Sequence, residues 1–215
     1  MSEIESALEL IRDKYRAYTF YENEDIIAYL DSNTNKDEQI EQIEQICGII
    51  EYEFDTDIDD DVYNIVVAND QNNIVGVFRG YIEEDKITDT TVCAKSGLEL
   101  GEYLRYYALL KMNITHKITS LSGAISGGIP RILEDDSTLV VKQKKDKLLE
   151  YHEKRGAEIT DDISKTKIFT YYLDTILKQI HLKSPTSPGK KRKTKKRRTK
   201  KRKKKRKTKK RKTKK

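Results

Sequence analysis

The residues whose types and spacing best suit chemistry lie in one short turn, 96–101. The turn follows a β-branched run and precedes a stretch with apolar residues at helical spacing, so it joins a strand to a helix. A helix N-terminus presents unpaired backbone N–H groups and the positive end of the helix dipole. Glycine at Gly97 and Gly101 lets an anionic group approach that backbone closely. The turn is therefore a candidate phosphate-binding site.

The same turn allows a second interpretation, in which it only closes a helix. Ser96 followed three residues later by Glu99 is the pattern of a capping box, whose two side chains satisfy the first backbone N–H groups. The carboxylates of Glu99 and Glu102 would also repel an anion. Phosphate binding and capping therefore both stay open at this point.

A second pair of candidates stands near the end of a helix predicted over 142–155, where Gly156 is suited to the C-cap. Tyr151 and His152 are neighbours there. A phenol with an ordinary pKa of about 10 keeps its proton at neutral pH and suits a general acid, whereas an imidazole titrates near about 6.5. Either residue is a candidate proton donor. The alternative is that both pack against a sheet.

The elements that position these residues follow from hydrophobic periodicity. Helices are predicted over 3–18, 23–30, 40–50, 98–112, 142–155 and 175–182, and strands over 62–68, 74–82, 87–94, 117–126, 157–159 and 166–173. Short polar turns join the first three strands into an antiparallel meander. The helix over 98–112 separates two strands and requires a parallel crossover. The predicted fold class is α/β, with a mixed, mostly antiparallel central sheet, one β-α-β crossover and helices on both faces.

This order of elements resembles the GNAT family, the Gcn5-related N-acetyltransferases, over roughly residues 61–174. Three places carry the resemblance. Val75-Gly76-Val77 lies in the second strand, the turn 96–101 follows the third, and the stretch 148–158 is similar to a late helix that ends in a Tyr-x-x-x-Gly turn. The resemblance implies a GNAT-like fold and an acetyl-CoA-dependent N-acetyltransferase.

The resemblance also implies roles for particular residues. In the family the turn and helix start hold the pyrophosphate of acetyl-CoA, and two splayed parallel strands accept the pantetheine arm. This implies cofactor-binding roles for Val92, Ala94, Ser96, Gly97, Leu98, Leu100, Gly101 and Ser126. The chain departs from the family pattern, because Glu99 stands at the middle glycine position and Ser96 at that of the leading Arg or Gln.

The catalytic roles implied are those of a proton donor and a general base. The family's tyrosine, which can protonate the departing thiolate, falls on His152, with Tyr151 beside it. The resemblance therefore makes these two residues the candidate catalytic pair. Candidates for the base are the carboxylates near the strands that usually face the substrate, namely Glu83, Glu84 and Asp89.

The C-terminal segment 190–215 contains only Lys, Arg and Thr, and 22 of its 26 residues are cationic. The whole chain carries +7, which leaves −15 for residues 1–189. A segment without apolar residues cannot bury a core, so disorder is predicted for it. Polycations of this kind bind nucleic acid or other polyanions by counterion release. The alternative partner is the chain's own acidic part.

The predicted domain organisation has three parts. Residues 1–183 form a GNAT-like acyltransferase domain, with a helical N-terminal part over 1–50 and a core over 61–174. Residues 184–189 form a linker rich in Ser and Pro, and 190–215 form the basic tail.

Two functions remain as hypotheses. In the first, the chain transfers an acetyl group to an amine such as a Lys side chain, an amino terminus or a polyamine, and its negative charge favours a cationic acceptor. In the second, an inactive GNAT-like module binds nucleic acid through its tail. The tail also resembles those on proteins of large DNA viruses, which implies a virion or packaging role.

Composition excludes several other classes. No apolar run is long enough for a membrane span, and Glu3, Glu5 and Glu9 interrupt any apolar signal-peptide core. Cys47 and Cys93 lack metal-site spacing and are expected to be buried thiols in a reducing compartment. With only three histidines in the chain, no metal site is expected. The protein is expected to be intracellular, nuclear or virion-associated, and not secreted.

Overall fold

The computed structural model describes residues 2–32, 36–47, 61–125, 138–163 and 166–183. The chain divides into two compact units, 1–182 and 183–215, and the elements below belong to the first. In chain order they are α1 (Glu3–Lys14), β1 (Tyr18–Glu22), α2 (Glu24–Ser32), α3 (Lys36–Cys47), β2 (Val62–Asn69), β3 (Ile74–Glu83), β4 (Lys86–Ala94), α4 (Leu100–His116), β5 (Ser120–Ala124), α5 (Thr138–Glu153), β6 (Glu158–Asp161), β7 (Lys167–Tyr172) and α6 (Leu173–Lys183), the last of which ends one residue into the second unit.

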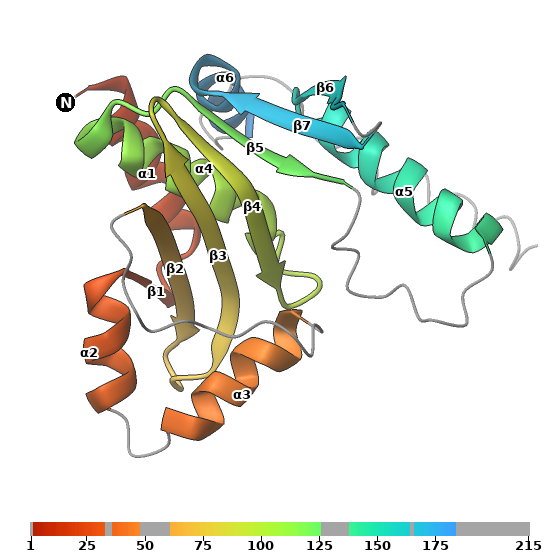
Figure 1. Ribbon diagram of the computed structural model, residues 1–215. Helices are drawn as coiled ribbons and strands as arrows, with labels where there is room; N and C mark the ends of the chain where they lie inside the picture. Colours follow the sequence, from red (N-terminus) through yellow and green to blue (C-terminus); the bar gives the residue numbers. More distant parts are fainter. Residues whose placement is uncertain (1, 33–35, 48–60, 126–137, 164–165, 184–215) are drawn as a thin grey trace, which may run out of the picture. The chain divides into compact units, whose positions relative to one another are not determined.

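The described strands form one seven-stranded sheet in the order β1-β2-β3-β4-β5-β7-β6 (Figure 1). Neighbouring strands are antiparallel except β4 and β5, which the helix α4 connects as a parallel crossover. A crossover of this kind needs a connection long enough to return along the sheet, and α4 supplies it. The predicted mixed α/β fold with one β-α-β unit is therefore confirmed.

Helices cover both faces of the sheet, as expected. The strand β2 shows why, because its side chains alternate between two apolar cores. Ile65 and Val67 belong to the core shared with α1, α4 and α6, whereas Val66 and Ala68 belong to the core shared with α2 and α3. In Figure 1, α2 and α3 lie in front of the sheet and α1 and α4 behind it.

The helix α4 lies against β3 at Gly76. A Cβ atom on Gly76 would come within 2.7 Å of Leu100 Cδ2 and 3.0 Å of Leu104 Cδ1. Atoms of the protein interior are packed too densely to allow that approach. The apolar-Gly pair at Val75 and Gly76 therefore has a local cause, which is the close seating of α4 on the sheet.

The strand β1 was missed by the sequence prediction, which extended a helix to Tyr18 and expected only helices over 1–50. In the structure α1 ends at Lys14, and Tyr18–Glu22 pairs antiparallel with β2 at the sheet edge. The run Tyr18-Thr19-Phe20-Tyr21 is aromatic and β-branched, and side chains of these types favour strands.

Two further expectations need correction or fall outside the description. Cys93 is buried and disulfide-bonded, so the expectation of a thiol there is wrong, which removes one reason for placing the chain in a reducing compartment. Ser126 and the segments predicted as linker and tail lie outside the described residues.

Candidate functional site

The two parallel strands of the crossover are joined at one end only. The strands β4 and β5 pair at Lys86 with Ser120 and at Ile87 with Leu121, and their ladder stops there. Figure 1 shows the two strands diverging beyond this point. One side chain still links them, because Thr90 Oγ1 donates a hydrogen bond of 2.9 Å to the Ser122 carbonyl. The C-terminal parts of β4 and β5 therefore frame a gap in the sheet.

A β-bulge lies on β4 beside this gap. In the β3–β4 ladder Arg79 pairs with Thr91 and Tyr81 with Thr88, so β4 has one more residue than β3 between these pairs. The extra length includes Asp89, whose φ of +46° is in the left-handed region that Asp tolerates better than most residues. A bulge leaves its extra residue without a ladder partner and redirects the strand.

The turn after β4 leads into α4 without a side-chain cap. Gly97 has a φ of +89°, and Glu99, the N-cap, has a φ of +55° and makes no capping hydrogen bond with its side chain. The helix begins at Leu100. The capping-box interpretation, which placed the N-cap at Ser96, is therefore wrong. The side chain of the N-cap residue therefore does not close the first turn of α4, and a helix start without this cap can present backbone N–H groups to a ligand.

The two carboxylates at this turn each have a cationic partner from elsewhere in the chain. Lys14 Nζ, at the end of α1, lies 3.3 Å from Glu99 Oε2. Glu102 is buried and accepts hydrogen bonds from Tyr106 Oη at 2.6 Å and from Arg155 Nε at 2.7 Å. The repulsion that the sequence suggested is therefore largely neutralised in the folded chain.

A second guanidinium, that of Arg105, lies in α4 just beyond its first turn. Arg105 Nη1 donates to the Gly101 carbonyl at 3.1 Å, and the guanidinium carbon stands 5.4 Å from the centre of the Phe169 ring. Arg105 Nε is buried and has no hydrogen-bond partner among the described residues. Burial lowers the pKa of Arg105, although four neighbours, including Glu102, act in the opposite direction.

Seven of the eight predicted cofactor-binding residues lie in β4, in the turn after it or in the first turn of α4, and Ser126 lies outside the described residues. A Cβ on Gly101 would meet Val92 Cγ1 at 3.6 Å and Ala94 Cβ at 3.8 Å, both ordinary contacts, so Gly101 faces these two residues of β4. Ser96 and Gly97 are exposed. Leu98 and Leu100 serve the fold, since the Leu98 carbonyl accepts from Tyr15 Oη at 3.1 Å and the Leu100 side chain is buried.

Of the two candidate proton donors, His152 has the environment of a core residue. It is 1% exposed, stacks on Phe169 with ring centres 4.0 Å apart, and its Nδ1 lies 2.9 Å from Tyr171 Oη. Burial, with smaller contributions from Arg105 and Arg155, lowers the pKa of His152 to about 3. The ring is therefore neutral at pH 7 and held by two aromatic neighbours.

Tyr151 is better suited to donate a proton. Its ring is half-buried, and the Arg155 guanidinium lies 3.7 Å from the ring centre. Burial raises the pKa of Tyr151, and Arg105 and Arg155 offset part of that rise, so the phenol keeps its proton at neutral pH. The structure therefore favours Tyr151 over His152 as the candidate acid.

Sequence reasoning missed three cations at this site: Lys14, Arg105 and Arg155. Arg105 had a signal, because it stands four residues after Gly101 on the same helix face. Lys14 and Arg155 had none, because they lie 85 and 53 residues away from the carboxylates they meet.

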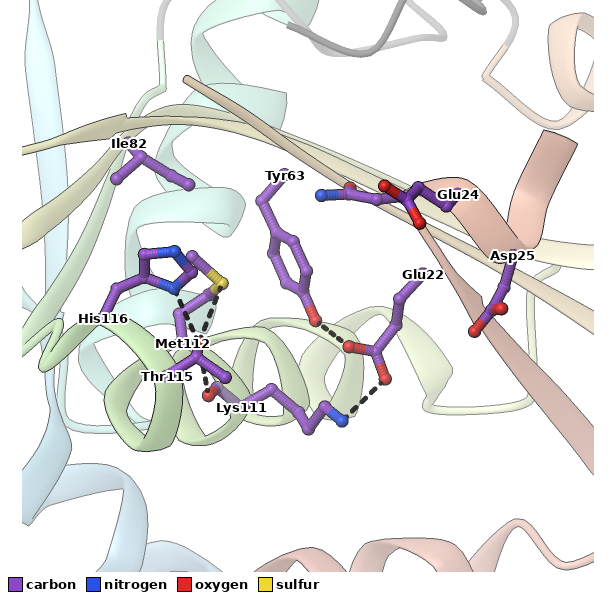
Figure 2. Close-up of a pocket in the computed structure, with 10 residues that line it drawn as sticks. Glu22, Glu24, Asp25, Tyr63, Ile82, Lys111, Met112, Thr115 and His116 are labelled. Atoms are coloured by element: carbon purple, nitrogen blue, oxygen red, sulfur yellow. Dashed lines mark hydrogen bonds and ion pairs between the residues drawn. The ribbon is translucent and has the colours of Figure 1, made fainter. Parts of the chain in front are cut away.

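A separate pocket lies at the other end of α4 (Figure 2). Its volume is about 410 Å³, and none of the predicted site residues lines it. At its centre Glu22 accepts from Tyr63 Oη at 2.7 Å and lies 3.1 Å from Lys111 Nζ. The lining residues are Glu22, Asn23, Glu24, Asp25, Tyr63, Ile82, Lys111, Met112, Thr115 and His116.

Within the described ranges no His, Cys, Asp or Glu side chains gather in threes as a metal ion would require. None of the helices placed by the structure has both the length and the apolar character needed to cross a bilayer.

No protein-family model matches the sequence, and no curated protein matches it. Solved structures do match. A variant of the spermidine/spermine N-acetyltransferase from Vibrio cholerae is 12% identical, with 76% of this chain and 98% of that chain covered and a TM-score of 0.47. An N-acetyltransferase from Campylobacter jejuni in complex with acetyl coenzyme A is 16% identical, with 53% and 70% covered and a TM-score of 0.36. Both are N-acetyltransferases, the class that the sequence resembles. At these scores, the case for a function rests on the geometry of this chain.

Proposed function

We propose that this protein is an acetyl-CoA-dependent N-acetyltransferase that acts on an amine. The observation that carries the proposal is the gap between β4 and β5, which pair at two positions and then separate, with the uncapped start of α4 at the end of β4. The C-terminal parts of β4 and β5 are thus not paired with each other, and they lie next to a helix terminus that can bind an anion, so we propose that the extended arm of the ligand lies along them.

The residues of this region suit such a ligand. The backbone of Gly97 is open, since nothing lies within 4 Å of a Cβ built there. Gly101 at the first turn of α4 leaves room for a phosphate to approach the N–H groups. Val92 and Ala94, half-buried on β4, line the strand side of the turn. These residues would hold the diphosphate and the adjoining part of the pantetheine arm.

Acetyl-CoA supplies a thioester whose acetyl group passes to the amine nitrogen as the C–S bond breaks. The chain's own residues would do three things. Backbone N–H groups of the bulged strand β4 would polarise the carbonyl, as oxyanion holes do. Tyr151 would give its phenolic proton to the departing sulfur. A carboxylate would take a proton from the amine, and Asp89, exposed at the bulge, is the candidate base.

The acceptor proposed is a cationic amine, such as a Lys side chain, an amino terminus or a polyamine. Residues 1–189 carry −15, and a field of that sign raises the local concentration of cations. The neighbouring structure from Vibrio cholerae is that of a spermidine/spermine N-acetyltransferase, which supports testing polyamines first.

The proposal is tested by titrating the full chain with acetyl-CoA and by following acetyl transfer to spermidine. We expect saturable binding in the micromolar range and turnover. In Tyr151→Phe we expect kcat to fall about a hundredfold with acetyl-CoA affinity unchanged, because only proton donation is lost. The matched control is Tyr172→Phe, at an exposed phenol that bonds Glu158. Absence of binding at millimolar acetyl-CoA would refute the proposal and favour an inactive GNAT-like module.

For the segment 190–215 we propose contact with nucleic acid or another polyanion, and through it a nuclear or virion-associated location. The support is its composition, in which 22 of 26 residues are cationic. Deleting 190–215 should abolish DNA binding and its steep salt dependence while acetyl transfer to small amines survives. A truncated chain that bound DNA with the same salt slope would contradict this.

A further inference from the structure

The start of α4 contains two carboxylates at the place where the proposed function needs an anion to bind. Glu99 is the N-cap and Glu102 lies in the first helical turn. Unpaired charges this close to a bound diphosphate would oppose it by Coulomb repulsion, which is strong where water is partly excluded. If the turn is to bind a phosphate, other residues of the chain must neutralise these two carboxylates.

The folded chain brings three cations to this turn. Lys14 pairs with Glu99 at 3.3 Å and its Nζ lies 3.8 Å from the centre of the Tyr103 ring. Arg155 pairs with Glu102 at 2.7 Å. Arg105 donates a hydrogen bond of 3.1 Å to the Gly101 carbonyl, and the Glu102 carboxylate acts on its charge from nearby. Among the described residues these three cations exceed the two carboxylates by one positive charge, and Lys95, exposed directly before the turn, adds another.

Of the two ion pairs at this turn, the pair formed by Arg155 and Glu102 is the more deeply buried. The Glu102 side chain is only 4% exposed and the Arg155 side chain 26%, whereas Lys14 and Glu99 are 38% and 72% exposed. Exposed pairs are screened by water and contribute little, and buried pairs are screened much less. Glu102 is further held by Tyr106 Oη. The carboxylate most harmful to an anion is thus the one most firmly paired.

We infer that Arg155 is a positioning residue that neutralises Glu102, so that the first turn of α4 binds the diphosphate of acetyl-CoA without a basic residue in the turn itself. The inference rests on the proposed function and deepens it. Arg155 lies in the turn directly after α5, so this late part of the fold would take part in nucleotide recognition. Arg105 adds positive charge beside the turn 96–101, which has no basic residue of its own, and exposed Lys95 directly precedes that turn.

The test compares two ligands that share the thioester and differ in the diphosphate: acetyl-CoA and S-acetylpantetheine. Arg155→Gln keeps an amide that donates to Glu102 but removes the charge. We expect it to weaken acetyl-CoA binding about tenfold, as an uncompensated charge at this range would, and to leave S-acetylpantetheine affinity unchanged. Arg155→Lys keeps the charge and should stay within about threefold of the unaltered chain.

The decisive variant is the double substitution. Glu102→Gln added to Arg155→Gln removes the charge that needed neutralising, and we expect acetyl-CoA affinity to return to within about threefold of the unaltered chain. Lys154→Gln, which removes an exposed charge one residue away, is the matched control and should change nothing. Circular dichroism verifies that each variant folds.

Two results would overturn the inference. One is an equal loss of affinity for both ligands in Arg155→Gln, which would mean a general structural effect. The other is failure of Glu102→Gln to restore binding. Should Arg155→Gln not fold, Glu102→Gln alone decides, because the inference requires it to bind acetyl-CoA at least as tightly as the unaltered chain. If the unaltered chain does not bind acetyl-CoA, the proposed function itself fails.

Discussion

The two ends of α4 are built from similar parts with opposite electrostatic results. At each end a carboxylate is held by tyrosine hydroxyls and one cation: Glu102 by Tyr106 and Arg155, and Glu22 by Tyr63, Tyr107 and Lys111. At the N-terminal end the surplus charge is positive, on Arg105. At the C-terminal end it is negative, on exposed carboxylates of the α2 start, Glu24 and Asp25.

This difference follows the helix dipole, whose N-terminal end is positive and whose C-terminal end is negative. The surplus side chains reinforce the dipole at each end instead of cancelling it. The comparison shows that one helix supports two environments of opposite sign, and that the carboxylate networks at the two ends need not have the same purpose. We expect the network at the Glu22 end to stabilise the fold, and we infer that the network at the Glu102 end serves the proposed binding site.

The largest effect expected is on stability at the Glu22 end. Glu22→Leu leaves the hydroxyls of Tyr63 and Tyr107 and the ammonium of Lys111 without their acceptor, and we expect a loss of about 3 kcal/mol in the free energy of unfolding. Urea titration measures it. The exposed neighbour is the control, since Glu24→Leu should cost less than about 0.5 kcal/mol. If Glu22→Leu leaves the free energy of unfolding unchanged, the network around Glu22 has no structural role, and the proposed difference between the two ends of α4 is wrong.

The next largest effect is on the stability in acid, and it should differ between two histidines, His152 and His116. The pKa of His152 is about 3 in the folded chain, against about 6.5 when unfolded, so the unfolded state binds more protons between these values and stability falls as the pH drops below about 6.5. At pH 5 this costs about 2 kcal/mol. In His152→Gln the difference in unfolding free energy between pH 7 and pH 5 should shrink by about that amount.

The control for the acid effect is His116→Gln, at an exposed ring beside the pocket. Because the His116 side chain is exposed, we expect the substitution to change the free energy of unfolding by less than about 0.5 kcal/mol at either pH. If both variants behave alike, burial of His152 does not govern the acid sensitivity.

The smallest expected effect concerns Gly101, in the first turn of α4, where the proposed diphosphate would bind. Gly101→Ala has room, because its Cβ would lie 3.6 Å from its nearest neighbour, so the fold should gain about 0.5 kcal/mol from reduced entropy of the unfolded chain. Acetyl-CoA should nevertheless bind about threefold more weakly, because the added methyl group limits the approach of the phosphate. Thermal melting and calorimetric titration measure the two quantities. If Gly101→Ala raised both the stability and the affinity for acetyl-CoA, the first turn of α4 would not be the binding surface.

The architecture was largely predictable because it rests on local signals. Apolar, β-branched runs separated by short polar turns over 62–94 predicted the meander, and the helical spacing that begins at Leu98 predicted the crossover helix. The exception, β1, was lost because Tyr18 continues the helical spacing of the preceding segment, and only pairing with β2 decides its conformation.

The candidate site was half predictable. The turn 96–101 was located from its own residues, because strand, glycine and helix start are adjacent in the sequence. Its electrostatics were not predictable, because the cations that neutralise Glu99 and Glu102 come from the end of α1 and from the turn after α5, which are distant in the sequence. The choice of Tyr151 over His152 as the candidate proton donor also required the structure, because the burial of adjacent side chains cannot be predicted from their residue types alone.

The short seam between β4 and β5 has a mechanical consequence. A sheet is weakest where the fewest backbone hydrogen bonds join two strands, and here the ladder covers two residue positions with one threonine hydroxyl beyond it. The strands β5, β7 and β6 are therefore expected to open as one cooperative unit ahead of β1 to β4. In hydrogen exchange, the chain would behave as two folding units sharing a hinge, with the hinge at Ile87 and Leu121.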